Sequence, residues 1–188
     1  MKYMMNESAD QSVKELFREI PTIRGKGLVL KKITHEDEDA IRKLVSSEAV
    51  YRYEPSFLLE KRYEDIPFMI DRLYDECLEE SLILGIFQEE VFCGLAEFYG
   101  FRARVHKIST GYRLSEHCWG RGIATRALSL MVDYLYGETK IEIITASTLP
   151  ENKASERVLM KNGFQLVAAN SDEDWGYEKP LPTDKWIR

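Results

Sequence analysis

The most constraining feature of this 188-residue sequence is a strand–helix–strand pattern over residues 105–148, with a glycine-rich connection before the helix. "VHKISTGYRLS" at 105–115 and the isoleucine-rich "KIEIITAST" at 140–148 both predict strands. Between them, a predicted helix over 122–136 repeats apolar residues at helical spacing: Ala124, Ala127, Leu128, Met131, Val132 and Leu135. A helix that leaves a strand and returns to another forms a crossover unit, so this segment predicts a layered α/β fold.

Other segments extend the pattern in both directions along the chain. Apolar periodicity and turn residues predict helices over 10–20, 34–47, 63–80 and 151–164, a strand over 27–33, a hairpin over 81–100, and a terminal strand pair in "QLVAA" and "DWGYEKPL". Asn152 fits an N-cap position, and Gly163 fits a left-handed residue at a helix end, with Phe164 folded back on Leu159. Gly25-Lys26-Gly27 precedes a strand and is interpreted as a turn.

Length and composition narrow the class of protein. A chain of this length suits one domain, residues 1–188, with 1–22 as an N-terminal extension. The net charge of −6 argues against a nucleic-acid partner. No apolar run approaches the ~18–20 residues of a membrane span, and the first residues lack the apolar core of a secretory signal.

The cysteines and histidines give no framework for a disulfide or a metal. Cys77, Cys93 and Cys118 are far apart and form no CxxC pair, which favours a reducing compartment and a cytoplasmic protein. His35 and His106 belong to no HxxxH or HExxH pattern, so no metal site is expected.

The glycine-rich connection has the chemistry of an anion site. The first N–H groups of a helix have no intrahelical acceptor, and they carry the positive end of the helix dipole. Gly120 and Gly122 permit positive φ angles and remove Cβ atoms that would hold a phosphate away, while Arg121 and Arg126 add charge. The connection lacks the GxxxxGK[ST] pattern of nucleotide loops and the early GxGxxG pattern of dinucleotide folds. A tight turn that binds nothing is the alternative.

Two longer segments carry a family resemblance. "WGRGIATRA", followed one strand later by "PENKASERVLMKNGF", resembles the Gcn5-related N-acetyltransferases (GNAT), and within them the RimJ/RimL-like branch that acetylates ribosomal-protein N-termini. The family's pyrophosphate loop has the pattern (Q/R)xxGx(G/A), to which Gly122 and Ala124 correspond. Trp119 occupies the Q/R position, a departure that is familiar in the RimJ/RimL-like branch. The resemblance covers roughly residues 24–170 and implies a mixed central sheet with helices on both faces.

The resemblance also implies an activity and a set of cofactor-binding residues. Members transfer an acetyl group from acetyl-CoA to a primary amine, on a small molecule or a protein N-terminus, by direct transfer in a ternary complex. A non-catalytic acyl-CoA-binding regulator on the same fold is the alternative, and a nucleotide- or phosphate-binding domain unrelated to CoA is less favoured. A homodimer would be common for the family. The residues that correspond to the family's CoA site are Tyr112, Arg113, Leu114, Trp119, Gly120, Arg121, Gly122, Ile123, Ala124, Thr125 and Asn152.

The catalytic residues are less well determined by the resemblance. Many members use a tyrosine of the last helix as the acid, but Leu159 occupies that position. The RimJ/RimL-like branch implies Ser155 instead. As the base we expect Glu97, whose apolar strand neighbours would raise its pKa. A solvent-facing Glu97 is the alternative.

Several further residues remain alternatives. Glu116, His117 and Glu54 are other candidate bases, and for each a plain surface loop residue is the competing interpretation. Cys118 is interpreted as a small filler rather than a nucleophile. The aromatic residues around Trp175 and Trp186 line either an acceptor pocket, a dimer contact or the core.

Overall fold

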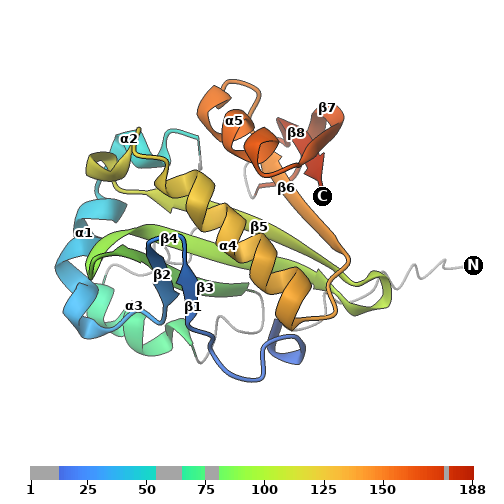
Figure 1. Cartoon of the computed structure of the whole chain (residues 1–188). Helices are drawn as coiled ribbons and strands as arrows, with labels where there is room; N and C mark the ends of the chain where they lie inside the picture. The colour runs from blue at the N-terminus through green and yellow to red at the C-terminus, as the bar shows by residue number, and fades with distance from the viewer. Residues whose placement is uncertain (1–12, 54–64, 75–80, 176–177) are drawn as a thin grey trace, which may run out of the picture.

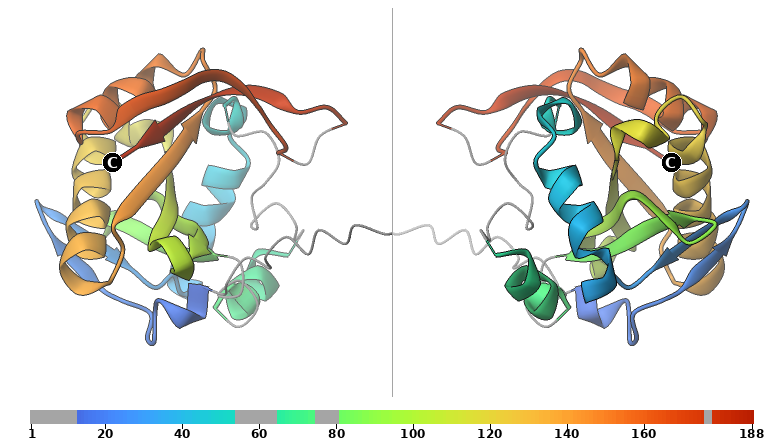
Figure 2. Two further views of the ribbon diagram at one scale, coloured as in Figure 1. Left: turned by 90° about the vertical axis from the view of Figure 1, so that its right-hand side faces the viewer. Right: turned by 90° about the vertical axis from the view of Figure 1, so that its left-hand side faces the viewer.

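The computed structural model describes residues 13–53, 65–74, 81–175 and 178–188. Within these ranges, eight strands form one mixed sheet, ordered β1-β2-β3-β4-β5-β6-β8-β7, with helices on both faces (Figures 1 and 2). Neighbouring strands are antiparallel except for β5 and β6. The strands are β1 (Ile23–Gly25), β2 (Leu28–Lys31), β3 (Ser81–Gln88), β4 (Val91–Arg102), β5 (Lys107–Leu114), β6 (Ile143–Thr148), β7 (Gln165–Glu173) and β8 (Leu181–Ile187). The predicted α/β fold class is confirmed.

Helix α4 (Ile123–Glu138) covers one face of the sheet, as the strand–helix–strand pattern predicts (Figure 1). The helix continues through Gly137, two residues beyond the predicted end. Five residues of the predicted apolar stripe are buried, namely Ala127, Leu128, Met131, Val132 and Leu135, and Ala124 is partly buried. Ile123 and Leu130 are buried as well. Burial of each larger side chain contributes about 1.5–3 kcal/mol, so this stripe holds the helix against the sheet.

Helix α5 (Lys153–Lys161) lies against α4 and has the predicted ends. The Asn152 side chain accepts a hydrogen bond from the Ser155 N–H (3.1 Å), which confirms the N-cap. At the other end, Gly163 has φ 78° and the Phe164 N–H donates to the Leu159 carbonyl (3.1 Å), which is the predicted Schellman arrangement. Both ends are thus set by local sequence.

The opposite face of the sheet carries α1 (Glu38–Val45), the short α2 (Glu48–Tyr51) and α3 (Ile66–Leu73) (Figure 2). The predicted helix over 34–47 is split into a 3-10 turn, His35–Asp37, and α1. The predicted helix over 63–80 is observed only as α3, which begins after the N-cap Asp65, and residues 75–80 lie outside the described ranges.

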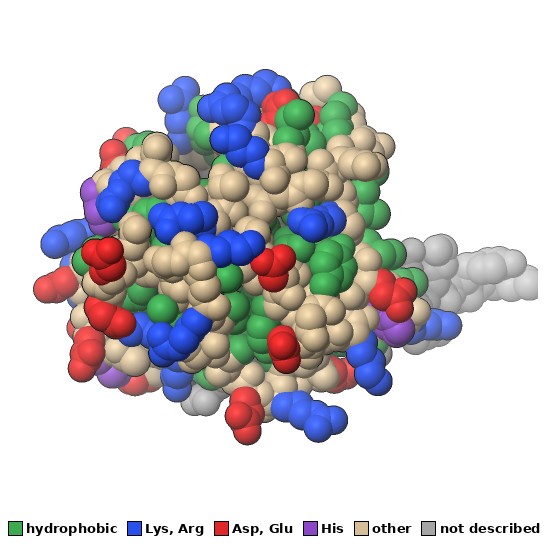
Figure 3. Space-filling view, in the orientation of Figure 1, with side chains coloured by type: hydrophobic (Ala, Val, Ile, Leu, Met, Phe, Trp, Pro, Cys, Tyr) green, Lys and Arg blue, Asp and Glu red, His purple; other side chains and the backbone are tan. Residues whose placement is uncertain are grey.

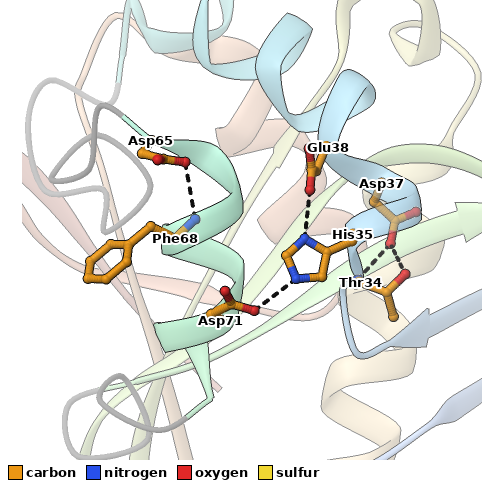
Figure 4. Close-up of polar contacts among 7 residues, drawn as sticks. All are labelled: Thr34, His35, Asp37, Glu38, Asp65, Phe68 and Asp71. Carbon is orange, nitrogen blue, oxygen red and sulfur yellow. Dashed lines mark hydrogen bonds and ion pairs between the residues drawn. The ribbon is translucent and has the colours of Figure 1, made fainter.

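A histidine joins two of the helices on this face. The His35 ring contacts the Glu38 carboxylate (2.6 Å) and the Asp71 carboxylate (2.8 Å), so it bridges α1 and α3 (Figure 4). The hydrogen bonds that the ring donates to both carboxylates raise the pKa of His35 above its usual 6.5. The His35 side chain is exposed, and its ring has this structural role.

Turns and edges differ from the sequence prediction in three places. Gly25-Lys26-Gly27 is a turn, as predicted, but it joins β2 to the unpredicted strand β1. Of the predicted helix over 10–20, the described part contains one 3-10 turn, Val13–Glu15. The second strand of the terminal pair is β8, not "DWGYEKPL", because the buried anchors Thr183 and Trp186 lie beyond that segment.

The parallel pair β5–β6 is the feature that creates a site. The two strands pair from Lys107↔Ile143 to Ser109↔Thr145 only. Beyond these residues, β5 continues beside β4 as far as Leu114, and β6 continues beside β8 as far as Thr148. The strands therefore separate and leave an opening near the middle of the sheet. No helix in the described part of the chain is both long and apolar enough to cross a membrane.

Candidate active site

The opening between β5 and β6 lies where two cavities meet. The larger cavity, about 460 Å³, is lined by the end of β5, the connection to α4, the first turn of α4, and α5. The smaller cavity, about 240 Å³, is lined by β4, β5, β6 and the end of β7. Tyr53, Arg113, Asn152 and Ser155 line both. A ligand in one cavity can therefore reach a ligand in the other through this opening.

The glycine-rich connection forms one wall of the larger cavity. Gly120 and Gly122 both have φ 70°, and a Cβ built on either would have no heavy atom within 4 Å. Gly122 is the N-cap of α4, so the N–H groups of Ile123, Ala124 and Thr125 belong to the first turn of the helix and have no intrahelical acceptor. The predicted anion site is thus open, unobstructed and built on backbone donors.

Three of the residues predicted to contribute to the phosphate site have hydrogen-bond partners within the protein. The Trp119 N–H donates to the Glu116 carbonyl (3.0 Å), so this amide is already used, while the indole of Trp119 lines the cavity and donates to the Leu114 carbonyl (2.8 Å). Arg121 donates to the Gln88 side chain (3.2 Å) and is not part of the cavity lining. Arg126 is directed to the Lys26 carbonyl (2.7 Å). Both arginines stabilise neighbouring turns.

Positive charge reaches the larger cavity from α5 instead. Arg157 and Lys161, four residues apart on one helix face, line the cavity opposite the glycine connection. Lys and Arg side chains gather over α5 at the top of the molecule (Figure 3). Sequence reasoning missed these two residues, although their i, i+4 spacing after Asn152 was a usable signal.

The free edge of β5 offers further backbone donors. The Ser115 N–H donates to the Cys93 carbonyl, so residue 115 faces β4. Because backbone groups of successive strand residues point to alternate edges, Leu114 and Tyr112 face the opening and Arg113 faces β4. The indole bond to the Leu114 carbonyl agrees with this assignment. Of the three predicted backbone donors, the Arg113 amide is therefore directed away from the opening.

Ser155 and Tyr112 form a hydroxyl pair at the junction of the cavities. Ser155 lies in the first turn of α5, behind the Asn152 cap, and its Oγ is 3.0 Å from the Tyr112 Oη. Tyr112 was expected to act through its backbone alone. Leu159, at the position of the family tyrosine, is buried in the core.

Glu97 lies in the smaller cavity, beside a buried cation. The Glu97 Oε2 is 3.4 Å from the Arg113 Nη1, and both side chains are largely buried, with 13% and 3% of their surface exposed. Glu97 and Arg113 lie on the same face because Glu97 pairs with Gly111, two residues before Arg113. The expected apolar surroundings are thus wrong, since a guanidinium is the charged neighbour. The solvent-facing alternative is also wrong.

The remaining candidates have other environments. Glu116 accepts a hydrogen bond from Ser47 (2.6 Å) and, like His117, lines neither of the two cavities. Glu54 lies outside the described residues. Burial, and to a smaller extent the nearby Cys93 thiol, raises the pKa of the Cys118 thiol to about 12, so Cys118 is a filler as predicted.

The two tryptophans that were considered for an acceptor pocket lie in different environments. Trp186 is a core residue whose indole donates to the Thr148 hydroxyl (3.0 Å). Trp175 lines the smaller cavity.

An α/β sheet that opens beside a helix end with backbone N–H donors agrees with the acetyltransferase class to which the sequence motifs point. The family model for the acetyltransferase (GNAT) domain matches residues 27–165, and the chain belongs to this family. The chain is 27% identical over 149 residues to the uncharacterized N-acetyltransferase YoaA of Bacillus subtilis, an alignment that covers 77% of this chain and 83% of YoaA.

Solved structures agree on the fold. RimL, the ribosomal L7/L12 alpha-N-protein acetyltransferase in complex with coenzyme A, superposes with a TM-score of 0.74 at 16% identity, over 89% of this chain and 97% of RimL. Spermidine N-acetyltransferase from Vibrio cholerae, in complex with CoA and spermine, gives a TM-score of 0.70 at 15% identity, over 87% and 96% of the two chains. At these identities the likeness establishes the GNAT fold and leaves the branch of the family open.

Proposed function

We propose that this protein transfers an acetyl group from acetyl-CoA to a primary amine, by direct transfer while both substrates are bound. The observation that carries the proposal is the pair of cavities that meet at the β5–β6 opening. One cavity has a helix end with backbone N–H donors, the other has a buried carboxylate, and a hydroxyl pair lies at the junction. Solved GNAT neighbours that contain CoA support the choice of acyl carrier.

The larger cavity fits the phosphates of acetyl-CoA. Backbone N–H groups of Ile123, Ala124 and Thr125 supply donors and the positive end of the α4 dipole. Arg157 and Lys161 supply the counter-charge from the opposite wall. Gly120 and Gly122 leave space for close approach of the phosphates, because neither has a Cβ.

The free edge of β5 fits the extended arm and the thioester. The Tyr112 and Leu114 N–H groups face the opening, where an extended amide-containing chain can pair with them as an added strand does. A donor directed at the thioester oxygen stabilises the negative charge that develops there, and each such donor is worth about 3 kcal/mol in a site that excludes water.

The proton transfers are assigned to the hydroxyl pair and to Glu97. Bound acetyl-CoA supplies an electrophilic carbonyl carbon and a thiolate leaving group. Glu97 accepts a proton from the acceptor amine, whose pKa of about 8–10 keeps it mostly protonated at neutral pH. Ser155, hydrogen-bonded to Tyr112, donates a proton toward the sulfur. The raised pKa of Cys118 argues against an acetylated cysteine and so favours direct transfer.

Within the family, the sequence motifs favour the RimJ/RimL-like branch. RimL and RimJ structures superpose on this chain, but at 16% and 20% identity. The neighbours include enzymes named for spermidine and for a ribosomal protein, so an amine acceptor is common to them.

The proposal is tested by release of free thiol from acetyl-CoA in the presence of a panel of primary amines. We expect at least one amine to give turnover, and acetyl-CoA to bind with 1:1 stoichiometry in calorimetry. Binding without turnover of any amine would support the alternative of a non-catalytic acyl-CoA-binding protein. Thermal stabilisation by ATP or NAD but not by CoA would contradict both.

A further inference from the structure

The smaller cavity is lined by a buried hydroxyl that has no hydrogen-bond partner in the protein. Among the described residues, three threonines are buried, Thr110, Thr148 and Thr183. The Thr148 hydroxyl accepts a hydrogen bond from the Trp186 indole (3.0 Å), and the Thr183 hydroxyl donates to the Ser171 carbonyl (3.1 Å). Thr110 is 3% exposed and lines the cavity, but its Oγ1 has no partner. Thr110 therefore differs from the other two buried threonines.

The separation of β5 and β6 explains why this hydroxyl has no partner. One residue earlier, at the last β5–β6 pair, the Ser109 and Thr145 hydroxyls form a hydrogen bond across the two strands (2.8 Å). At Thr110 the pairing with β6 has ended. On the other side, Thr110 pairs with Phe98 of β4, whose side chain has no polar atom. The hydroxyl therefore lies where the opening begins, without a protein group to bond.

The hydroxyl belongs to the acceptor side of the site. Thr110 lines the smaller cavity but not the larger one. Tyr112 projects from the same face of β5, because side chains two residues apart in a strand share a face, and its hydroxyl is bonded to Ser155 at the junction of the cavities. Glu97, the assigned base, lines the same cavity as Thr110. An amine bound near Glu97 is therefore in the cavity that contains the Thr110 hydroxyl.

An acceptor amine has the donor that this hydroxyl lacks. A buried polar group without a partner destabilises the folded protein, so a ligand that satisfies it gains affinity. The neutral form of a primary amine carries N–H donors as well as the lone pair that attacks the thioester. An N–H donated to the Thr110 Oγ1 holds the nitrogen and leaves its lone pair directed at the carbonyl carbon, which is the orientation that direct transfer requires.

We propose that the Thr110 hydroxyl binds and orients the reacting nitrogen of the acceptor amine. This inference rests on the proposed function and adds to it a residue that touches the acceptor. The hydroxyl accepts an N–H of the amine, while Glu97 takes the proton that the ammonium form loses. The stability that the free protein lacks because of this unsatisfied hydroxyl is regained when the acceptor binds.

The stability of the free protein provides the first test. Thr110→Val keeps nearly the same shape and removes the hydroxyl, so it should raise Tm by about 2–4 °C. Thr183→Val is the matched control, because Thr183 is fully buried and hydrogen-bonded and lines neither cavity, and this change should lower Tm. If Thr110→Val lowers Tm as the control does, a permanent partner such as an internal water satisfies the hydroxyl, and the inference is wrong.

Acceptor turnover provides the second test. The amine probes are 1,4-diaminobutane, benzylamine and a short peptide with a free α-amine, each assayed by thiol release from acetyl-CoA. For the amines that the parent protein acetylates, loss of one hydrogen bond in Thr110→Val should lower kcat/KM for the amine about 3–10-fold. The Kd for acetyl-CoA, measured by calorimetry, should not change, and Thr183→Val should leave both quantities as in the parent. An unchanged kcat/KM in Thr110→Val would overturn the inference.

A pair of smaller substitutions covers the case in which Thr110→Val folds poorly. Thr110→Ser and Thr110→Ala lose the same methyl group and differ only in the hydroxyl. The serine variant should keep kcat/KM for the amine close to that of the parent, whereas the alanine variant should show the loss. Equal values for the two variants would contradict a role of the hydroxyl in acceptor binding.

The two proposals fail in distinguishable ways. If the parent acetylates an amine and the variants without the hydroxyl do so equally well, the transfer reaction stands and the role of Thr110 is wrong. If the parent binds acetyl-CoA but acetylates none of the probes, the transfer reaction fails, and the assignment of Thr110 to an acceptor fails with it.

Discussion

Replacement of Gly122 by alanine tests the proposed anion site, and the loss of stability that the replacement causes can be calculated. Gly122 has φ 70°, a conformation that costs an L-residue about 1–2 kcal/mol. A Cβ at this position has no heavy atom within 4 Å, so no steric clash with the protein adds to that cost. For a domain of this size, each kcal/mol lowers Tm by about 2–4 °C. Gly122→Ala is therefore expected to lower Tm by about 2–8 °C.

The same substitution should weaken acetyl-CoA binding by a larger and separate effect. The added Cβ projects from the connection that supplies the N–H groups, and it displaces a phosphate oxygen from at least one of them. Loss of one hydrogen bond to a charged oxygen costs about 1.5–3 kcal/mol. The Kd for acetyl-CoA, measured by calorimetry at 25 °C, should then rise about 10–150-fold.

Gly163→Ala is the matched control. Gly163 also has a positive φ, 78°, at the end of α5, and a Cβ there would lie 3.7 Å from the Arg188 guanidinium, an ordinary contact. It lines neither cavity, so the same backbone strain should appear without any change in Kd. If Gly122→Ala lowers Tm like the control but binds acetyl-CoA like the parent protein, the phosphate-binding assignment is refuted.

Three further predictions follow from the site and its surroundings. Ser155→Ala and Tyr112→Phe should each lower kcat about 100-fold, and the double variant should lower it little more, because the two hydroxyls act as one unit. Initial rates of thiol release measure kcat, and a double variant whose loss is the product of the two single losses would contradict the prediction. Two carboxylate partners raise the pKa of His35 above 6.5, so His35 stabilises the fold fully below about pH 6.5, and this contribution is lost as the pH rises through the folded-state pKa. The difference in free energy of unfolding between the parent protein and His35→Gln, measured in urea, should therefore shrink from about pH 5.5 to about pH 9. With a pKa of about 12, about one Cys118 thiol in ten thousand is ionised at pH 8, so iodoacetamide should label Cys118 in urea but not in the native protein, as read by mass spectrometry.

The parts of the fold that sequence reasoning predicted are those set by local chemistry. The ends of α5 follow from Asn152 and Gly163, residues whose effect reaches only one helical turn. The burial of α4 follows from an apolar stripe within one segment. The positive φ angles of Gly120 and Gly122 were predictable for the same reason, because they depend on the glycines themselves.

The parts that were missed depend on contacts between distant segments. The pairing of Glu97 with Arg113 requires knowledge of the β4–β5 register, which a single sequence does not provide. Arg157 and Lys161 line the larger cavity because α5 packs beside α4, where Asn162 donates to the Thr125 carbonyl (3.2 Å). The position of β8 between β6 and β7 is likewise a property of the assembled sheet.

That strand order has a consequence for the protein during synthesis. β8 lies between β6 and β7 in the sheet, but it is synthesised after both. The end of β7 that lines the smaller cavity therefore has no partner strand until residue 187 has emerged from the ribosome. Before that point β6 exposes an unpaired edge, which is prone to association with other nascent chains. The growing polypeptide should therefore complete the smaller cavity last, after the glycine-rich connection that lines the larger cavity has been made.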